Sequence, residues 1–302
     1  MSAGGSRWVA YGCLALSMSL VGSYIALTRP LVAALPIFLL AWLRFGIGAV
    51  AMLRWLRKPA TEPALDARTR GLIFLESFLG NFLFTLCMVA GISMTSAVSA
   101  GVILSAIPGV VAVFSWYFLK EHIGARTWVA LALGMLGIAL LAFVQNEDSG
   151  QVAGDAGRIW LGNALIFCAV LCEAAYAVIG KRLTSVMSPK RISAVINLCS
   201  LVLITPLGIY AARDFSFSAV PGGIWLLLVF YSLAASVWTV WLWMTGVTHV
   251  PASRAAVFMV LMPVGTAAVG VLVLGEPFTS MHLLAFVLAL TGLVLATAPS
   301  RS

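Results

Sequence analysis

Ten long apolar runs follow one another along the chain, separated by short polar segments or by proline. Their approximate limits are residues 8–28, 32–55, 70–91, 95–119, 123–144, 159–181, 190–212, 222–246, 251–274 and 279–298. A helix needs roughly 20 apolar residues to cross a bilayer core of about 30 Å. The runs are too long for the strands of a membrane barrel and lack their alternating polarity. The pattern predicts an all-α polytopic membrane protein with ten transmembrane helices.

The composition agrees with this interpretation. Of the 302 residues, 62% are hydrophobic and 9% are charged, and the mean hydropathy is +1.07. Soluble domains carry about 25% charged residues, so this chain lacks the polar surface of a soluble enzyme or a disordered chain. The first run covers about 20 residues, whereas the apolar core of a signal peptide covers about 7–15, and we expect a retained helix.

Basic side chains are distributed unevenly among the loops. With the N-terminus in the cytoplasm, fourteen Lys and Arg residues fall on the cytoplasmic side and three on the other, as the positive-inside rule requires. The net charge of +8 arises from short clusters beside apolar runs, without a basic stripe interleaved with aromatic residues. We therefore expect a lipid bilayer and no nucleic acid as partner. The sequence predicts an inner-membrane protein with both termini in the cytoplasm.

The two halves of the chain resemble each other at an offset of 155 residues. The matched pairs are Gly91 and Gly246, Pro108 and Pro263, Glu121 and Glu276, and Gly137 and Gly292. Near an offset of 152, further pairs are Trp8 and Trp160, and Tyr24 and Tyr176. We divide the chain into a first five-helix repeat (1–145), an external linker (146–158) and a second five-helix repeat (159–302) within one membrane domain.

Five helices per half is an odd number, so the second half would enter the membrane from the opposite side. The sequence thus predicts an inverted-topology repeat with a pseudo-two-fold axis in the membrane plane. Proteins built in this way alternate between inward-open and outward-open forms, and their substrate binds near the midplane between the halves.

Several residues carry a resemblance to a known family. Arg44 lies in the run at 32–55, Pro108 and Pro263 lie mid-run, and Glu121 and Glu276 close the same two runs. With this order over ten helices, the chain resembles the drug/metabolite transporter superfamily and its EamA-type exporters. Within the superfamily it is most similar to bacterial inner-membrane exporters of aromatic amino acids. The resemblance implies a bundle with a central cavity lined by both halves, and export of small metabolites, above all amino acids with aromatic ones favoured.

Three charged residues lie within the predicted spans: Arg44, Glu76 and Glu173. A charge at the bilayer centre costs about 2.5–3.5 kcal/mol on insertion scales and is normally paired or functional. In one interpretation, Arg44 pairs with a glutamate and fastens two helices together. In the other, a glutamate carries a proton or binds the ammonium group of a substrate.

Polar and aromatic residues at mid-depth are the candidates for substrate binding. They are Tyr24, Ser77, Asn81, Ser99, Tyr176, Ser232, Ser236 and Trp238. Buried hydroxyls and amides need hydrogen-bond partners, which either a zwitterionic substrate or a neighbouring helix can supply. Trp238 would form an aromatic wall of the cavity, whereas Trp243, nearer the end of its run, is expected in the interfacial belt.

Two prolines and two glutamates complete the set of candidate residues. Pro108 and Pro263 lack a backbone N–H, which predicts symmetric kinks that act as hinges or only shape the cavity. Glu121 and Glu276 are expected to cap neighbouring helix ends near the membrane surface.

Catalytic signatures are absent from the sequence, which lacks GxSxG, HExxH and Walker A motifs. All five cysteines lie in apolar runs, and we interpret them as packing residues rather than as disulfides or metal ligands. We expect a transporter of small molecules that has no cofactor and no metal. A broad-specificity drug exporter of the same fold, a membrane-embedded enzyme and a channel are the alternatives, and the oligomeric state is left open.

Overall fold

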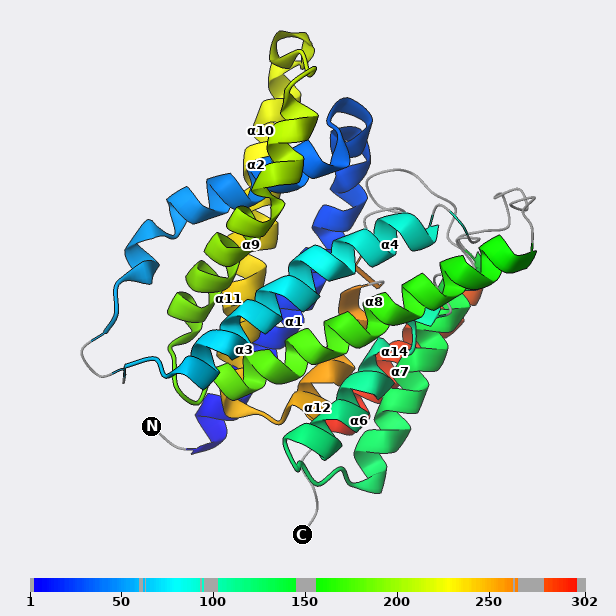
Figure 1. Cartoon of the computed structure of the whole chain (residues 1–302). Coiled ribbons are helices and arrows are strands. Elements are labelled where there is room, and N and C mark those ends of the chain that lie inside the picture. Colours follow the sequence, from blue (N-terminus) through cyan, green and yellow to red (C-terminus); the bar gives the residue numbers. More distant parts are fainter. Residues whose placement is uncertain are drawn as a thin grey trace.

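A computed structural model describes residues 3–59, 62, 64–92, 94, 103–144, 156–262, 264–265 and 280–297. In this part of the chain every regular element is a helix and there is no strand (Figure 1). The first half contains α1 (Ala3–Ala34), α2 (Ile37–Ala51), the 3-10 helix η1 (Leu53–Leu56), α3 (Ala67–Ser77), the π-helix η2 (Phe78–Leu83), α4 (Phe84–Ile92), α6 (Ile107–Phe118) and α7 (Ala125–Val144). The second half contains α8 (Ala156–Leu183), α9 (Pro189–Ala212), the 3-10 helix η3 (Phe217–Ala219), α10 (Gly222–Ser232), the π-helix η4 (Leu233–Trp238), α11 (Thr239–His249), α12 (Ala252–Ala255), the 3-10 helix η5 (Ala256–Val260) and α14 (Ser280–Thr297).

Helical residues occupy every one of the predicted apolar runs. Within the described residues, four continuous helical segments are long and apolar enough to cross a membrane: Ala67–Met88, Gly157–Leu183, Pro189–Ala212 and Gly222–His249. Many large apolar side chains on the helices are exposed, which suits a protein whose outer surface faces lipid tails instead of water. The chain is therefore a multi-pass α-helical membrane protein.

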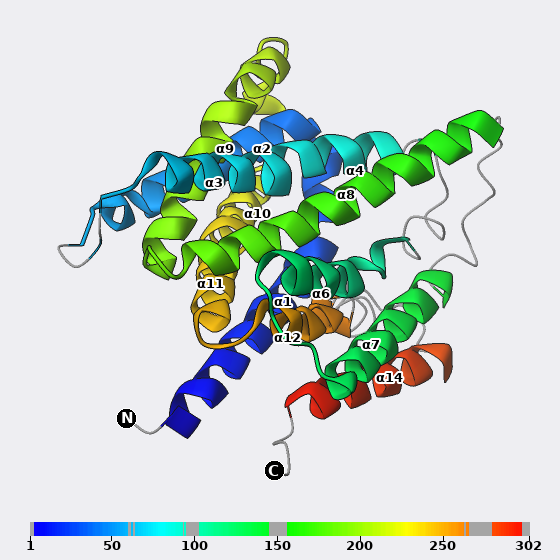
Figure 2. The ribbon, with the colours of Figure 1, turned by 60° about the horizontal axis from the view of Figure 1, so that its bottom comes forward.

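Helices pack mainly against partners from the other half of the chain. α1 packs along α11, and α4 packs along α8, so each pair joins one helix from each half. α2 pairs with α9, and α7 lies beside α14 at one edge of the bundle (Figures 1 and 2). In both views α1 begins and α14 ends toward the same end of the molecule. The interior is therefore an interface between the two halves of the sequence.

Two glycines at matching positions allow these helices to approach closely. A Cβ atom on Gly91 in α4 would lie 3.1 Å from the carbonyl oxygen of Gly162 in α8. A Cβ atom on Gly246 in α11 would lie 3.1 Å from the carbonyl oxygen of Ala10 in α1. Gly91 and Gly246 are 155 residues apart, and the residues that they contact, Gly162 and Ala10, are 152 residues apart. These are the two offsets found in the sequence.

The two π-helical segments also lie at matching positions. Each of η2 and η4 covers six residues, and Phe78 and Leu233, where they begin, are 155 residues apart. A π-helix inserts one extra residue into a helix and often marks a functional site. The candidate residues Asn81 and Ser236, which are also 155 residues apart, fall inside these two segments.

Pro108 does not kink a continuous helix as predicted. It occupies the first turn of α6, after a turn at Ser105 and Ala106 that follows the short helical stretch at Ile103. Proline is well tolerated there because the first N–H groups of a helix have no intrahelical acceptor. Pro108 therefore marks the start of a helix. Its counterpart Pro263 lies outside the described residues.

Glu121 caps a helix of the other half, as expected. Its carboxylate accepts hydrogen bonds from the backbone N–H groups of Ala252 (2.8 Å) and Ser253 (3.1 Å) and from the Ser253 hydroxyl (2.7 Å). Pro251 precedes α12 and has no side-chain oxygen with which to cap it. Glu276 lies outside the described residues.

Candidate functional site

The three charged residues predicted within the membrane lie on three different helices. Arg44 belongs to α2, Glu76 to α3 and Glu173 to α8. Arg44 and Glu173 are half-buried, and Glu76 is fully buried. The three positions come from both halves of the chain, and helices of both halves meet around them.

Two tyrosines link these charges into one cluster. Tyr176 lies one turn after Glu173 on α8, and its hydroxyl is within electrostatic range of Arg44, Glu76 and Glu173. The hydroxyl of Tyr24, on α1, is within range of Arg44 and Glu173. The side chains that the sequence singled out as charged or as repeat-paired tyrosines are thus brought together in space. We refer to these five residues as the central cluster.

Packing fixes the orientation of both tyrosine rings. The ring of Tyr176 lies so close to the backbone of η2 that a Cβ atom on Gly80 would overlap it. The ring of Tyr24 packs edge-to-face on Tyr231 of α10, with 5.5 Å between the ring centroids. An edge-to-face contact of this kind is a preferred geometry for aromatic pairs. Tyr231 of α10 therefore packs beside the central cluster through its contact with Tyr24.

Arg44 forms no ion pair with Glu76 or Glu173 among the residues that the structure describes. Its guanidinium carbon lies 4.3 Å from the ring centroid of the adjacent Phe45, and its Nε atom is buried without a hydrogen-bond partner. The ion pair between Arg44 and a glutamate, which was one of the two interpretations of the sequence, is therefore not formed in this conformation. A half-buried cation without an anionic partner can bind a carboxylate from a ligand.

Glu76 is the most isolated of the three charged groups. Both carboxylate oxygens are buried and have no hydrogen-bond partner. Gly180 of α8 faces it, so that a Cβ atom there would lie 2.7 Å from Oε1 of Glu76 and 2.9 Å from Cε of Met244. The absence of a side chain at Gly180 leaves the carboxyl group room against α8.

The predicted serines differ in how their hydroxyl groups are satisfied. Ser77 donates to the carbonyl of Ile73 at 2.9 Å, and Ser232 donates to the carbonyl of Leu228 at 2.6 Å. The hydroxyl of Ser236 is buried and has no partner. For Ser77 and Ser232 the helix itself supplies the acceptor, so of the three predicted serines that the structure describes, only Ser236 has a hydroxyl free for a ligand.

Asn197 on α9 is a buried polar residue that the sequence analysis did not select. Its Nδ2 donates to the carbonyl of Phe45 at 2.8 Å, and its Oδ1 has no partner. A Cβ atom on Gly48 would meet both Asn197 Oδ1 (2.9 Å) and Ser236 Cβ (2.8 Å), which places these two side chains at one crossing of α2, α9 and η4. An asparagine within an apolar run was the signal that could have identified it.

Trp238 and Trp243 occupy positions opposite to those expected. Trp238 is 39% exposed and packs edge-to-face on the exposed Phe230, with 6.1 Å between ring centroids. Trp243 is 4% exposed and lies in the main apolar core, so it is not part of an interfacial belt. Trp243 was expected in the belt because it lies near the end of its run, and depth along a run does not show which side of a helix is buried.

The remaining candidates add little to the cluster. Asn81 is half-buried within η2, where its backbone carbonyl accepts a hydrogen bond from the Thr85 hydroxyl. Ser99 lies outside the described residues, as does Pro263. Among the described residues, no group of three or more His, Cys, Asp or Glu side chains could hold a metal ion.

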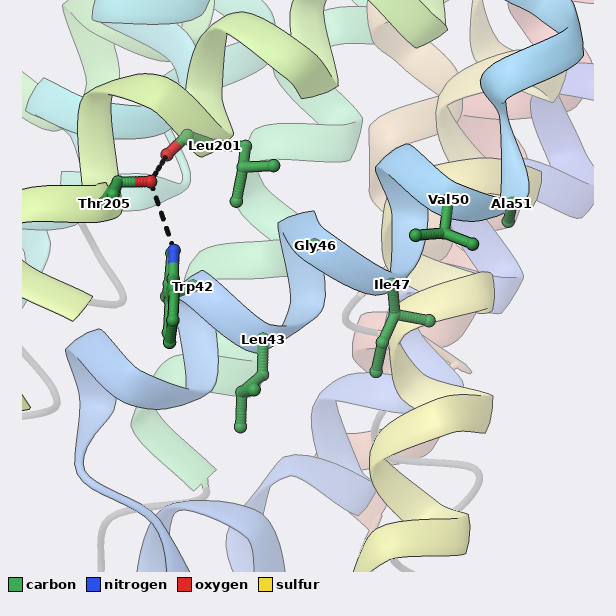
Figure 3. A pocket seen from close by; sticks show the side chains of 8 residues that line it. All are labelled: Trp42, Leu43, Gly46, Ile47, Val50, Ala51, Leu201 and Thr205. Atoms are coloured by element: carbon green, nitrogen blue, oxygen red, sulfur yellow. Dashed lines mark hydrogen bonds between the residues drawn. The ribbon is translucent and has the colours of Figure 1, made fainter. Parts of the chain in front are cut away.

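A pocket of about 710 Å³ lies apart from the central cluster, between α2 and α9 (Figure 3). It is lined by Trp42, Leu43, Gly46, Ile47, Val50, Ala51, Leu201 and Thr205. Trp42 Nε1 donates to Thr205 Oγ1 at 3.1 Å across the two helices. None of the residues predicted to bind substrate lines this pocket, and its lining is almost entirely apolar.

The model of the EamA-like transporter family matches the chain twice, over residues 8–143 and over residues 160–298. This chain belongs to the EamA-like transporter family. Both matches together cover nearly all of it, one on each side of the predicted linker. The membership makes this protein a membrane transporter, as the resemblance implied.

Relatives of this EamA-family protein span most of its length. "Uncharacterized transporter YetK" of Bacillus subtilis (strain 168) is 29% identical over 285 residues, which cover 94% of this chain and 85% of the relative. "Uncharacterized transporter YyaM" of the same organism is 24% identical over 265 residues, covering 86% and 84%. A crystal structure of a protein with 19% identity superposes with a TM-score of 0.77 over 98% of this chain and 97% of the other, which shows a shared fold. The relatives' names carry no substrate, so the similarity to aromatic amino acid exporters stays a prediction.

Proposed function

We propose that this protein is a secondary transporter that exports small amphipathic metabolites, with amino acids first among them and aromatic amino acids favoured. The observation that carries the proposal is that Arg44, Glu173, Tyr24 and Tyr176, from helices of both halves, lie within electrostatic range of one another. Membership in a transporter family supplies the class of activity, and the central cluster supplies the chemistry.

The chemistry of the cluster suits a zwitterion with an apolar or aromatic side chain. Arg44, which lacks an anionic partner, would bind the substrate carboxylate through charge-assisted hydrogen bonds. Glu173 would bind the ammonium group, and the faces of Tyr24 and Tyr176 would contact the side chain or the cation. Ser236, whose hydroxyl has no partner, would offer a further hydrogen bond from η4.

Alternating access between two inverted five-helix repeats is the transport mechanism that we propose. Three observations support it: the family model matches each half, the π-helices lie 155 residues apart, and the glycine contacts of α4 with α8 repeat in α11 with α1. Exchange of conformation between two such halves would open the central cluster first to one side and then to the other. The charge distribution of the loops supports a cytoplasmic location for both termini in the inner membrane.

Counterflow in proteoliposomes tests the proposal. Vesicles containing the purified protein are loaded with unlabelled phenylalanine, and uptake of labelled phenylalanine is measured against vesicles loaded with other amino acids or with cationic drugs. We expect transient accumulation that depends on internal aromatic amino acid, and its loss in Arg44→Gln but not in the exposed matched control Arg54→Gln. Accumulation driven only by cationic drugs would favour a broad-specificity exporter. A flux without trans-stimulation would contradict a carrier and favour a channel.

A further inference from the structure

Glu76 is not needed to bind the substrate in the arrangement proposed above. Its side chain is 0% exposed, and neither of its carboxylate oxygens has a hydrogen-bond partner. An ionised carboxylate without a partner is very unfavourable in an apolar interior, so the group must be neutral in this conformation. A carboxyl group that is neutral when buried and ionised when exposed binds and releases a proton as the protein changes conformation.

Among the residues that the structure describes, no cation beside Glu76 would hold it ionised. On α8, it faces Gly180, and Tyr176 is the titratable group within electrostatic range. Lys181, next to Gly180, instead donates to the backbone carbonyl of Val247 at 2.5 Å.

On the other helices packed against α3, the described residues beside Glu76 are uncharged. From α9, the carbonyl of Ile196 and the thiol of Cys199 lie beside Ser77, the residue after Glu76. From α11, the apolar Met244 lies against the same face of Gly180. η2 continues the same helix from Phe78 and contains no ionisable side chain.

We propose that Glu76 is the proton-binding carboxyl group that couples export to the proton gradient, and that Gly180 preserves the space in which it does so. The inference rests on the proposed function, since it assigns the energy coupling of that same transporter. Glu76 would bind one proton as its side chain faces the outside and release it to the cytoplasm as substrate occupies the central cluster. The carboxyl group alternates between COOH and COO⁻, and no other bond changes.

Glu76 belongs to the central cluster, so a change in its charge can act directly on the residues proposed to bind the substrate. Tyr176 is within electrostatic range of Glu76, Glu173 and Arg44, so a charge appearing at Glu76 changes the field at the substrate site. The π-helix η2 begins two residues after Glu76, and the irregular backbone there lies directly against the ring of Tyr176. A change in η2 would therefore move the proton site and the substrate site together.

Separating net transport from exchange tests the proposal. Wild-type and Glu76→Gln proteins are reconstituted, and two fluxes of labelled phenylalanine are measured: counterflow without a pH gradient, and uptake driven by an acidic vesicle interior. We expect Glu76→Gln to retain counterflow and to lose the pH-driven uptake, down to the level of protein-free vesicles. Glu62→Gln, which changes a glutamate outside the spans, serves as the matched control and should retain both fluxes.

Each outcome distinguishes this inference from the proposed function. Absence of counterflow in the wild type would contradict the proposed function itself. Wild-type counterflow without pH-driven uptake, or pH-driven uptake that survives in Glu76→Gln, would overturn the proton assignment alone. Loss of both fluxes in folded Glu76→Gln protein would also overturn it, because Glu76 would then be required for transport itself.

A direct measurement of protons provides an independent readout. Phenylalanine is added to protein in weakly buffered detergent solution with a pH indicator, and we expect proton release from the wild type but none from Glu76→Gln. Gly180→Ala, whose Cβ atom would lie 2.7 Å from Oε1 of Glu76, should slow pH-driven uptake more than counterflow. Gly71→Ala in α3, the helix of Glu76, meets no atom within 4 Å and should leave both fluxes unchanged. Proton release that persists in Glu76→Gln would contradict the proposal.

Discussion

At the scale of single residues, two glutamates outside the spans fasten the ends of helices that are distant in sequence. Glu121 joins the end of α6 to the start of α12, and Glu62 joins the loop before α3 to the start of α9. In both cases a carboxylate meets backbone N–H groups at a helix N-terminus, where the helix dipole also favours a negative charge. These contacts restrict the ends of the bundle without adding charge to its interior.

Replacement of Glu121 is expected to destabilise the protein. Glu121→Ala removes the acceptor of three hydrogen bonds at the start of α12, and loss of a helix cap costs about 0.5–2 kcal/mol. The melting temperature of the detergent-purified variant should therefore fall. Glu121→Gln keeps one acceptor oxygen, so its melting temperature should fall less. Equal melting temperatures for wild type and Glu121→Ala would show that the cap does not contribute.

Glu62 should make the stability depend on pH. Burial alone would raise the pKa of Glu62, but hydrogen bonds from Arg191 and Ser188 outweigh it and hold the pKa below its ordinary value. The stabilisation is therefore present above the pKa of the unfolded chain, about 4.3 for Glu, and is lost as the pH falls through the lower folded value.

The prediction for Glu62 is checked by melting curves at a series of pH values. The gap in melting temperature between wild type and Glu62→Gln should be open at neutral pH and should close as the solution becomes more acidic than about pH 4. A gap that widens on acidification would contradict the assignment. Arg191→Gln, which removes the ion-pair partner, should show the same trend.

At the scale of the elements, close packing between α4 and α8 and between α1 and α11 depends on glycine. A Cβ atom on Gly91 would lie 2.7 Å from Cδ1 of Ile166, and one on Gly246 would lie 2.5 Å from Cγ of Leu14. Both distances are too short for carbon atoms in contact, so the helices would have to move apart.

Gly91→Ala and Gly246→Ala should both lower the stability, by about 1–3 kcal/mol as is typical of overpacking. The matched control is Gly12→Ala in α1, where no atom lies within 4 Å of the added Cβ. It should be neutral or slightly stabilising, since alanine is the better helix former. Chemical or thermal unfolding of the three purified variants provides the comparison. A loss in Gly12→Ala that matched the other two would indicate that the effect is not steric.

The sequence predicted where helices would form but not how each one is oriented. The apolar runs located the helices because the bilayer imposes a length, whereas the π-helices were not predicted, although they lie 155 residues apart. Trp238 and Trp243 were placed from their depth along the run, which does not show which side of a helix is buried. Pro108 was assigned to a kink because proline in sequence alone does not distinguish a helix start from a helix interior.

The sequence identified the charged residues of the central cluster but not how they pair with one another. Charges within an apolar run are costly, which is why Arg44, Glu76 and Glu173 could be selected from sequence. Whether Arg44 pairs with a glutamate depends on distances between three helices, which no local pattern contains. Asn197 was missed for the same reason, since its importance arises from the crossing with Gly48 and Ser236.

At the scale of the whole molecule, the family match on each half and the repeated helix contacts lead to one prediction about topology. If each half contributes five spans, the linker at 146–158 lies outside the cell while both termini lie inside. An even number of spans per half would instead return the linker to the cytoplasm. The location of the linker therefore decides between an inverted and a parallel repeat.

Cysteine labelling in intact cells provides this measurement. Single cysteines replace Ser149 in the linker, the exposed Ser218 between α9 and α10, and the exposed Ser185 between α8 and α9, in a variant without its five native cysteines. A membrane-impermeant maleimide should label Ser149→Cys and Ser218→Cys in intact cells, and Ser185→Cys only after permeabilisation. The same orientation follows from the Lys and Arg residues around Ser185. If, with the N-terminus in the cytoplasm, Ser149→Cys and Ser218→Cys were both protected while Ser185→Cys was labelled, the number of spans in the first half would be even, and alternating access by exchange of two inverted halves would have to be abandoned.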